Sequence, residues 1–278
     1  MARAENKVTA GPTAQMVANL ARKLRVRKGW TQEQLGSEIG FSAAAVSAME
    51  TLAQPASDDM LVELEKVLGD GMAIFEDART SVRLEKYPEQ FKDFAPMEQS
   101  AVVLQMYETL VVNGLFQTEG YARALIGGGY PPLPEERVEE LVQARMERQA
   151  LFDRQPVASV ELIVEEAVLR RGIGNPEIMQ GQLLHLALCM RRRNVTLDVV
   201  PLNCGLDGEY AGARGGITIV ETPNHDRLVY LEPQDESLLI SDPAKVSTYA
   251  QRYAKIRAQA LGPRKSLGLI EQLAGEQR

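Results

Sequence analysis

The stretch Trp30–Glu50, WTQEQLGSEIGFSAAAVSAME, decides the fold of the N-terminal part of the chain. It predicts two short helices joined by a tight turn. Thr31 suits the N-cap of the first helix, and Gln34 completes a capping box in which each side chain accepts a hydrogen bond from the backbone N–H of the other residue. Gly40 suits the end of that helix, because glycine adopts the left-handed backbone conformation at little steric cost.

Apolar residues at helical spacing give each of these two helices one buried side. Leu35 and Ile39 stand four residues apart in the first helix. Ser42 suits the N-cap of the second helix, whose buried side is formed by Val46 and Met49. This pattern resembles the helix-turn-helix of the phage-repressor (XRE, lambda-repressor-like) family.

The resemblance implies an all-α, five-helix DNA-binding domain over residues 13–80. Residues 1–12 lack periodicity and are expected to form a flexible arm. The sequence around the motif fits this expectation. A helix with an apolar stripe is predicted from Thr13, Ser57 suits the N-cap of a fourth helix, and Ile74 lies in a fifth.

The resemblance also implies which residues contact DNA. In the phage-repressor family the second helix of the motif enters the major groove, while the first helix lies across the DNA backbone. Gln32 then contacts a phosphate, and the exposed residues early in the second helix face the base edges. The candidate DNA-binding residues are Arg25, Arg27, Lys28, Thr31, Gln32, Ser42, Ala43, Ala44, Ser47 and Thr51.

A dense basic cluster stands just before the motif, at Arg22, Lys23, Arg25, Arg27 and Lys28. Two interpretations are open. The cluster contacts phosphates, as the place of the first helix in the phage-repressor arrangement implies, or it is a solvated face that complements the negative end of a helix dipole.

The expected reading helix departs from the family pattern. It carries AAAVSAM, so the arginine, lysine, asparagine and glutamine side chains that read guanine and adenine are missing from it. The means of recognition left to this helix are methyl contact with thymine, hydrogen bonds from serine hydroxyls and readout of DNA shape. Residues 1–70 hold eight basic and nine acidic residues, so intrinsic DNA binding is expected to be weak. The alternative is a degenerate helix-turn-helix in a non-DNA-binding interaction or scaffold protein.

Composition bounds the class of protein. A length of 278 residues suffices for two domains, and 45% hydrophobic with 25% charged residues is ordinary for a globular protein. The net charge of −7 excludes a general polyanion binder. The sequence shows neither a secretory signal nor an apolar run of membrane-spanning length, and its two cysteines lack a disulfide or zinc pattern. We therefore expect a cytoplasmic protein without membrane association.

The remainder of the chain predicts a linker over residues 81–97 and an α+β effector or partner-binding domain over residues 98–278, with a mixed sheet of about five strands and flanking helices. A helix is expected from Glu98 to Asn113, because its apolar residues recur at helical spacing. Strands are expected at 157–164, 195–201, 217–221, 228–232 and 237–241. Further helices are expected at 118–125, 135–153, 175–193 and from 242 onward, with one or two turns after 266.

Several segments of this second region, in the order GLFQTEGYARAL, EEAVLRR, NVTLDVVP, LVYLE and DPAKV, resemble the C-terminal domain of WhiJ-like actinobacterial regulators, also described as Scr-type antitoxin-like regulators. The resemblance covers residues 13–275. It implies a DNA-binding transcriptional regulator that acts with a small cognate protein encoded nearby. A homodimer on a palindromic operator is expected, because two-fold operators suit two reading helices.

No catalytic, metal or cofactor site is expected. His185 and Cys189 stand four residues apart, but they lie in an apolar run without a third ligand nearby. Gly127–Gly129 lack the strand-before, helix-after setting of a phosphate loop and suit a connector. Arg191–Arg193 suit the end of a helix, with partner docking as the alternative. Gly205–Gly216 is expected to be a flexible loop between strands, either a plain connector or a cover over a pocket. We expect that the protein is not an enzyme, because no catalytic set of residues can be assembled.

Overall fold

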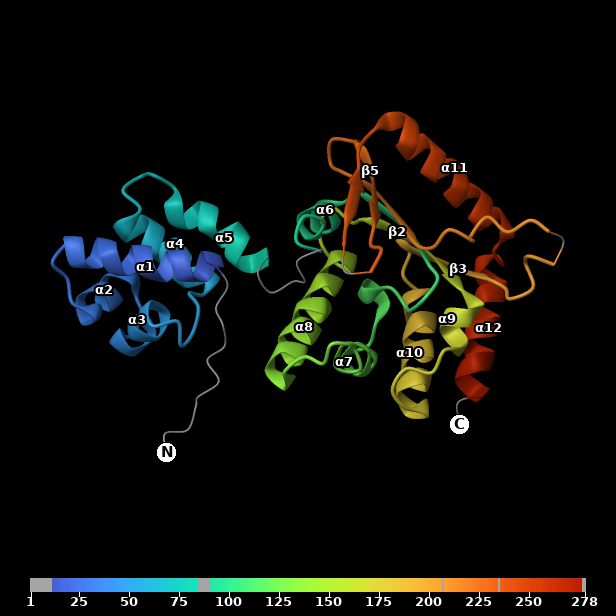
Figure 1. Cartoon of the computed structure of the whole chain (residues 1–278), viewed down its shortest axis with the longest axis horizontal. Helices are drawn as coiled ribbons and strands as arrows, with labels where there is room; N and C mark the ends of the chain where they lie inside the picture. Colours follow the sequence, from blue (N-terminus) through green and yellow to red (C-terminus); the bar gives the residue numbers. More distant parts are fainter. Residues whose placement is uncertain (1–11, 85–90, 207, 235, 277–278) are drawn as a thin grey trace. The chain divides into compact units, whose positions relative to one another are not determined.

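The structure is a computed structural model that describes residues 12–84, 91–206, 208–234 and 236–276. The chain divides into two compact units, Met1–Lys86 and Tyr87–Arg278. Figure 1 shows the all-helical first unit and the sheet-containing second unit. The expected arm over residues 1–12 lies outside the described residues except for Pro12, which begins the first helix.

Five helices form the described part of the first unit, as the sequence predicts. They are α1 Pro12–Arg27, α2 Gln32–Ile39, α3 Ala43–Glu50, α4 Asp58–Leu68 and α5 Ile74–Leu84. The capping box of Thr31 and Gln34 is present, and Gly40 ends α2 with φ of 74°. The Ser42 hydroxyl accepts a hydrogen bond from the Ala45 N–H at 3.1 Å and caps α3. The capping residues predicted from the sequence therefore form the expected hydrogen bonds.

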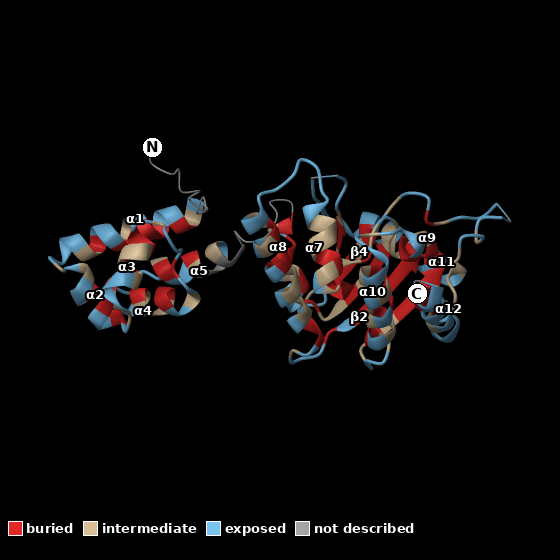
Figure 2. Ribbon diagram, turned by 90° about the horizontal axis from the view of Figure 1, so that it is seen from below, coloured by how far each residue is buried: buried red, intermediate tan, exposed pale blue. Residues whose placement is uncertain are grey.

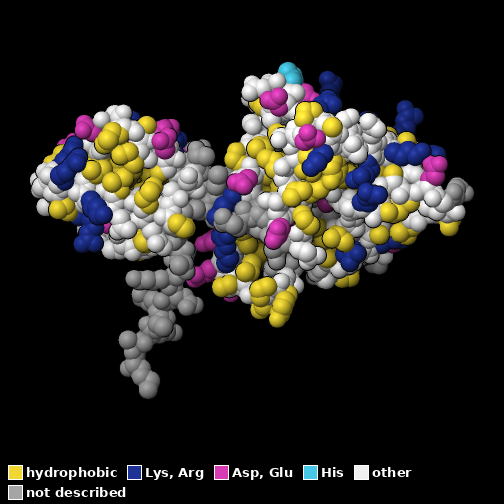
Figure 3. Space-filling view, turned by 45° about the horizontal axis from the view of Figure 1, so that its top comes forward, with side chains coloured by type: hydrophobic (Ala, Val, Ile, Leu, Met, Phe, Trp, Pro, Cys, Tyr) yellow, Lys and Arg dark blue, Asp and Glu magenta, His cyan; other side chains and the backbone are white. Residues whose placement is uncertain are grey.

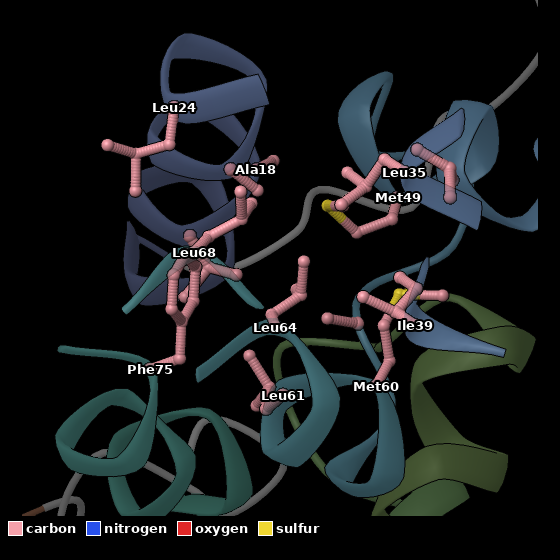
Figure 4. Packing of buried hydrophobic residues seen from close by; sticks show 14 of the residues in the cluster. Ala18, Leu24, Leu35, Ile39, Met49, Met60, Leu61, Leu64, Leu68 and Phe75 are labelled. Carbon is pink, nitrogen blue, oxygen red and sulfur yellow. The ribbon is translucent and has the colours of Figure 1, made fainter. Parts of the chain in front are cut away.

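The core of the first unit receives side chains from all five helices (Figure 4). Ala21 of α1, Leu35 of α2, Val46 of α3, Leu64 of α4 and Phe75 of α5 are completely buried. Because isolated helices as short as the eight-residue α2 and α3 are at best marginally stable in water, this shared core stabilises the helix pair that carries the motif.

The second unit contains a six-stranded mixed sheet in the order β3-β2-β1-β4-β5-β6. Its strands are β1 Val103–Glu108, β2 Ser159–Glu165, β3 Val195–Val200, β4 Ile217–Glu221, β5 Arg227–Leu231 and β6 Leu238–Ile240. The pairs β1–β2 and β2–β3 are parallel, whereas β1–β4, β4–β5 and β5–β6 are antiparallel. The sheet therefore has two parallel and three antiparallel strand pairs, and β1 takes part in one pair of each kind.

The prediction of a helix from Glu98 to Asn113 is wrong. A short helix, α6 Ala95–Ser100, ends before the strand β1 begins. Leu104 and Tyr107 are three residues apart, a spacing that fits a helix, yet they lie on opposite faces of a strand that is paired on both sides. Since both faces of this central strand are covered, apolar residues occur on both, and the two-residue alternation that marks a strand is blurred.

Residues 91–97 belong to the second unit rather than to a linker. Phe91 and Phe94 are buried, and the Phe94 ring stacks on the Tyr230 ring with 4.2 Å between centroids. The Phe91 and Phe94 rings pack edge to face, with 5.6 Å between their centroids. Of the other residues in the expected linker, 81–84 continue α5, and 85–90 lie outside the described residues.

Helices cover both faces of the sheet. On one face α11 Pro243–Gln259 packs Tyr253 and Ile256 against the strands. Figure 1 shows α7 Glu119–Gly127, α8 Glu135–Arg148 and α10 Pro176–Cys189 on the opposite side of the sheet from α11. The short α9 Glu166–Arg170 follows β2, and α12 Pro263–Glu276 packs against α10 and β3. Figure 2 shows buried residues concentrated in the sheet and along the inner sides of these helices.

Two other differences from the prediction concern the C-terminal part. The sheet has six strands instead of about five, since β1 was not predicted. The tail forms the 14-residue helix α12 instead of one or two turns. Within the described part of the chain, no helix is both long enough and apolar enough to cross a membrane.

Gly36 of α2 is required by a close backbone contact inside the motif. A Cβ atom added there would lie 2.5 Å from the Phe41 carbonyl oxygen. We expect Gly36→Ala to destabilise the first unit by about 1–3 kcal/mol, because the backbone of the turn must shift. Urea unfolding followed by circular dichroism measures this change.

The matched control is Gly181→Ala in the exposed middle of α10, where an added Cβ meets no atom within 4 Å. We expect it to stabilise by about 0.5–1 kcal/mol, because alanine favours a helix interior. Stabilisation by both substitutions would contradict the tight contact at Gly36.

Candidate nucleic-acid interface

A buried ion pair joins the end of α1 to the end of α3. Arg25 Nε and Nη2 donate to the Glu50 carboxylate oxygens at 2.6 and 2.9 Å. A third hydrogen bond, from Arg25 Nη1 to the Trp30 carbonyl oxygen at 2.7 Å, fixes the turn between α1 and α2. The Arg25 side chain is 11% exposed and that of Glu50 2%. Arg25 is thereby committed to the fold, although the resemblance assigned it to DNA.

Gln32 completes this cluster. Its amide Nε2 donates to Glu50 Oε2 at 2.9 Å, so α2 is tied to the same carboxylate as α1. Burial raises the pKa of Glu50, but the hydrogen bonds from Arg25 and Gln32 and the charges of Arg25 and Arg22 outweigh it, and the net pKa is lowered. Glu50 therefore has a structural role, and the Gln32 amide holds the start of α2 against the end of α3.

The exposed side of α3 offers small groups only. Ser42, Ala43 and Ala44 are exposed, and Ser47 is half-buried. The hydroxyl of Thr51, which follows α3, donates to the Ser47 carbonyl oxygen at 2.7 Å. This surface can therefore present methyl groups and hydroxyls to base edges, and the one charged side chain of α3, Glu50, is buried.

Some side chains of the basic cluster bind other parts of the first unit, and others are free to contact a ligand. Lys28 Nζ donates to the Val67 carbonyl oxygen at 2.7 Å and lies 4.7 Å from the centre of the Trp30 ring. By contrast, Arg22, Lys23 and Arg27 are exposed and form no ion pair within the described ranges. In Figure 3, Lys and Arg side chains gather at the end of the first unit where α1 leads into α2.

These placements refine the candidate site. Arg27 of the predicted residues is exposed, and Thr31 is exposed while its hydroxyl accepts the capping bond from the Gln34 N–H at 3.2 Å. Arg22 and Lys23 belong to the cluster but were not among the candidate residues, although their place in the last turns of α1 was a visible signal. DNA contact by any of these residues stays a prediction.

His185 and Cys189 lie together on α10. The Cys189 Sγ and the His185 Nε2 are 3.4 Å apart. Burial lowers the pKa of His185 and raises that of Cys189 to about 11, which disfavours the thiolate that a metal requires. No group of three or more possible metal ligands occurs among the residues that the structure describes.

The geometry of α2 and α3 defines the first unit as a helix-turn-helix domain. Residues 22–69 match the family described as Helix-turn-helix, of the XRE type, which supports a DNA-binding regulator. Residues 91–272 match the family described as Domain of unknown function (DUF5753). Because this second match covers more than half of the chain, the protein belongs to the DUF5753 family. No curated protein and no solved structure matches the chain.

The Arg25–Glu50 pair gives a prediction of stability. Glu50→Gln leaves the Arg25 charge buried without its carboxylate, and breaking such a pair costs about 3–5 kcal/mol. We expect this loss at pH 7, measured by urea unfolding of the first unit. Glu38→Gln, an exposed position in α2, is the control and should change stability by less than about 0.5 kcal/mol.

The pH dependence follows from the lowered pKa of Glu50. Its contribution is complete above the ordinary carboxyl pKa of 4.5 and is lost as the pH falls through the lower folded value. The difference between the wild type and Glu50→Gln should therefore be constant above pH 5 or so and shrink in stronger acid. An equal difference at all pH values would show that the Glu50 charge does not stabilise the fold.

Proposed function

We propose that the protein is a DNA-binding transcriptional regulator, and that α3 enters the major groove while the end of α1 contacts phosphates. The observation that carries this proposal is the combination of an intact helix-turn-helix with three uncommitted basic side chains beside it. The Arg22 charge acts on Glu50 at the end of α3, so the basic cluster lies near the proposed reading helix. The role is proposed as non-enzymatic and cytoplasmic.

In the proposed mode of binding, different residues provide the affinity for DNA and the recognition of its sequence. Arg22, Lys23 and Arg27 supply the phosphate contacts, which release counterions and carry most of the non-specific affinity. Ala43 and Ala44 supply methyl contact with thymine, which is weaker than a bidentate hydrogen bond to a base. Specificity then rests largely on DNA shape and on a second reading helix, as in a dimer on a palindromic operator.

Fluorescence anisotropy with a labelled duplex of the protein's own promoter tests DNA binding. We expect the triple substitution of Arg22, Lys23 and Arg27 by Ala to weaken binding and to reduce the salt slope by about 2.7, since each lost phosphate contact removes about 0.9. Arg193→Ala, at an exposed position in the second unit, should leave both quantities unchanged.

A second substitution tests the reading helix itself. Ala44→Glu adds a negative charge to an exposed position of α3, so the fold should be kept while binding to the promoter falls at least tenfold or so, equivalent to about 1.4 kcal/mol. Unchanged binding by Ala44→Glu and by the triple variant, or no binding by the wild type even at low salt, would favour the alternative of a non-DNA-binding interaction protein.

We further propose an antitoxin-like action with a small cognate protein that binds the second unit. The sequence resemblance to WhiJ-like regulators supports it, and so does one exposed apolar surface. Leu184 and Leu188 lie one turn apart on α10 and are 55% and 58% exposed, which is unusual for large apolar side chains that share a helix face.

Co-purification with the product of the neighbouring reading frame tests the partner. We expect the double substitution of Leu184 and Leu188 by Lys to abolish the complex, because two charges would be buried in an apolar contact. Tyr130→Lys, at an exposed position in the loop between α7 and α8, should leave the complex intact. A complex that survives the double substitution would exclude this face of α10.

A further inference from the structure

A cavity of about 640 Å³ lies within the second unit, and the function proposed above gives it no role. Its walls come from the end of β1, the start of β4, the end of β5 and parts of α8 and α11. This volume falls within the range of about 300–1,000 Å³ that is typical of sites for small organic ligands.

The topology places the cavity where ligands bind in sheets with parallel strands. The chain runs from β1 to β2 and β3 on one side, then returns to β4 on the other side of β1. Because β4 is antiparallel to β1, the segment that leads from β3 to β4 arrives beside the carboxyl end of β1. In open sheets with parallel strands, ligands bind outside these carboxyl ends. Glu108 ends β1 and Ile217 begins β4, and both line the cavity.

Arg145 of α8 is a desolvated cation that faces this cavity. Its Nη1 donates to the Gln117 side-chain oxygen at 2.9 Å, a neutral acceptor. Gln117 is itself held, since its Nε2 donates to the Val112 carbonyl oxygen at 2.6 Å. Burial, reinforced by the neighbouring charge of Arg148, lowers the pKa of Arg145 to about 10. In the part of the chain that the structure describes, Arg145 forms no ion pair.

Arg148, three residues along the same helix, shows the contrast. Its Nε and Nη2 donate to both Glu98 oxygens at 2.7 and 2.6 Å, and its guanidinium lies 4.0 Å from the centre of the Phe91 ring. Arg148 thus has a carboxylate in direct contact, whereas Glu232 and Glu98 raise the pKa of Arg145 only through the effect of their charges, without an ion pair among the described residues. An unpaired buried charge is costly, so an anion that enters the cavity would gain the interaction that Arg145 lacks.

The remaining lining sets the chemistry of the ligand. Arg214 and Arg252 also line the cavity and form no ion pair among the described residues. With Arg145 and Arg148 they make four arginines against three carboxylates in the lining, those of Glu98, Glu108 and Glu232, so the balance of charge is positive. The stacked rings of Phe94 and Tyr230 and the Tyr249 ring form an apolar wall. We propose that the cavity binds a small organic carboxylate, with its carboxylate on Arg145 and its apolar body against the aromatic wall. This binding does not depend on whether the first unit binds DNA.

Isothermal titration of the full chain tests the proposal with benzoate, indole-3-acetate and octanoate as probes. Each acid has a matched alcohol with the same body: benzyl alcohol, indole-3-ethanol and octanol. We expect at least one acid to bind roughly tenfold or more tightly than its alcohol at pH 6, because a charge-assisted hydrogen bond pair is worth about 1.4 kcal/mol or more.

Variants assign the interaction. Arg145→Gln keeps an N–H donor for Gln117 but removes the charge, so the preference for the acid should disappear, whereas Arg145→Lys should retain part of it. Arg193→Gln, an exposed position outside the cavity, is the matched control and should bind like the wild type. Failure of all three acids to bind at millimolar concentration, equal binding of acid and alcohol, or unchanged binding by a folded Arg145→Gln would overturn the proposal.

Glu108 supplies a second readout. Burial raises its pKa to about 7; the Glu232 charge acts in the same direction, against the hydrogen bond from Asn113 and the charge of Arg148. Tyr121 is a further titratable group on which the Glu108 charge acts, and its pKa is raised as well, chiefly by burial. Tyr107, Tyr230 and Glu98 line the same cavity. Glu108 is neutral below pH 7 and negative above it, so acid binding should weaken between pH 6 and pH 8. Glu108→Gln should abolish that change, and a wild-type affinity equal at both pH values would overturn the placement of the carboxylate in this cavity.

Discussion

The helix-turn-helix of this protein depends on one carboxylate, that of Glu50. It accepts hydrogen bonds from Arg25 of α1 and Gln32 of α2 while it ends α3, so three helices meet at two oxygens. The same guanidinium also binds the Trp30 carbonyl and thereby sets the turn before α2. Because Arg25 and Glu50 are charged and nearly excluded from water, each is costly to leave without its partner, and the geometry of the motif is closely specified. The orientation of α3 relative to α1 therefore follows from a polar cluster as well as from the apolar core.

This arrangement has a consequence for how the domain can meet DNA. The polar residues best placed by sequence to contact phosphate, Arg25 and Gln32, hold the fold together, and Lys28 binds the Val67 carbonyl at the end of α4. The charge that remains for DNA comes from Arg22, Lys23 and Arg27. A small number of phosphate contacts and a reading surface of alanines and serines both favour weak binding by a single domain. Two domains on one operator, or a partner that holds them together, would compensate for that weakness.

The second unit is organised by the position of β1. That strand pairs in parallel with β2 and antiparallel with β4, so it is buried on both faces and its carboxyl end opens into the cavity. The same burial explains why the strand was not predicted. Leu104, Met106 and Tyr107 are all buried, which removes the two-residue alternation that separates a strand from a helix in sequence. Phe91 and Phe94 were missed for a related reason, since charges and a proline surround them and their partner, Tyr230, lies far along the chain.

Local features could be predicted from the order of residues: the caps of α2 and α3, the glycine that ends α2, the buried sides of the five helices, the later strands of the sheet and the small side chains of α3. These features depend on residues within one or two turns of each other, so the order of residues suffices to predict them. The roles of the long polar side chains could not be predicted in this way, because they depend on contacts formed in the folded chain. Arg25 meets Glu50 across 25 residues, and Arg145 meets Gln117, rather than a carboxylate, across 28. Whether an arginine supports the fold or faces a ligand depends on partners that folding brings together, and no local pattern records them.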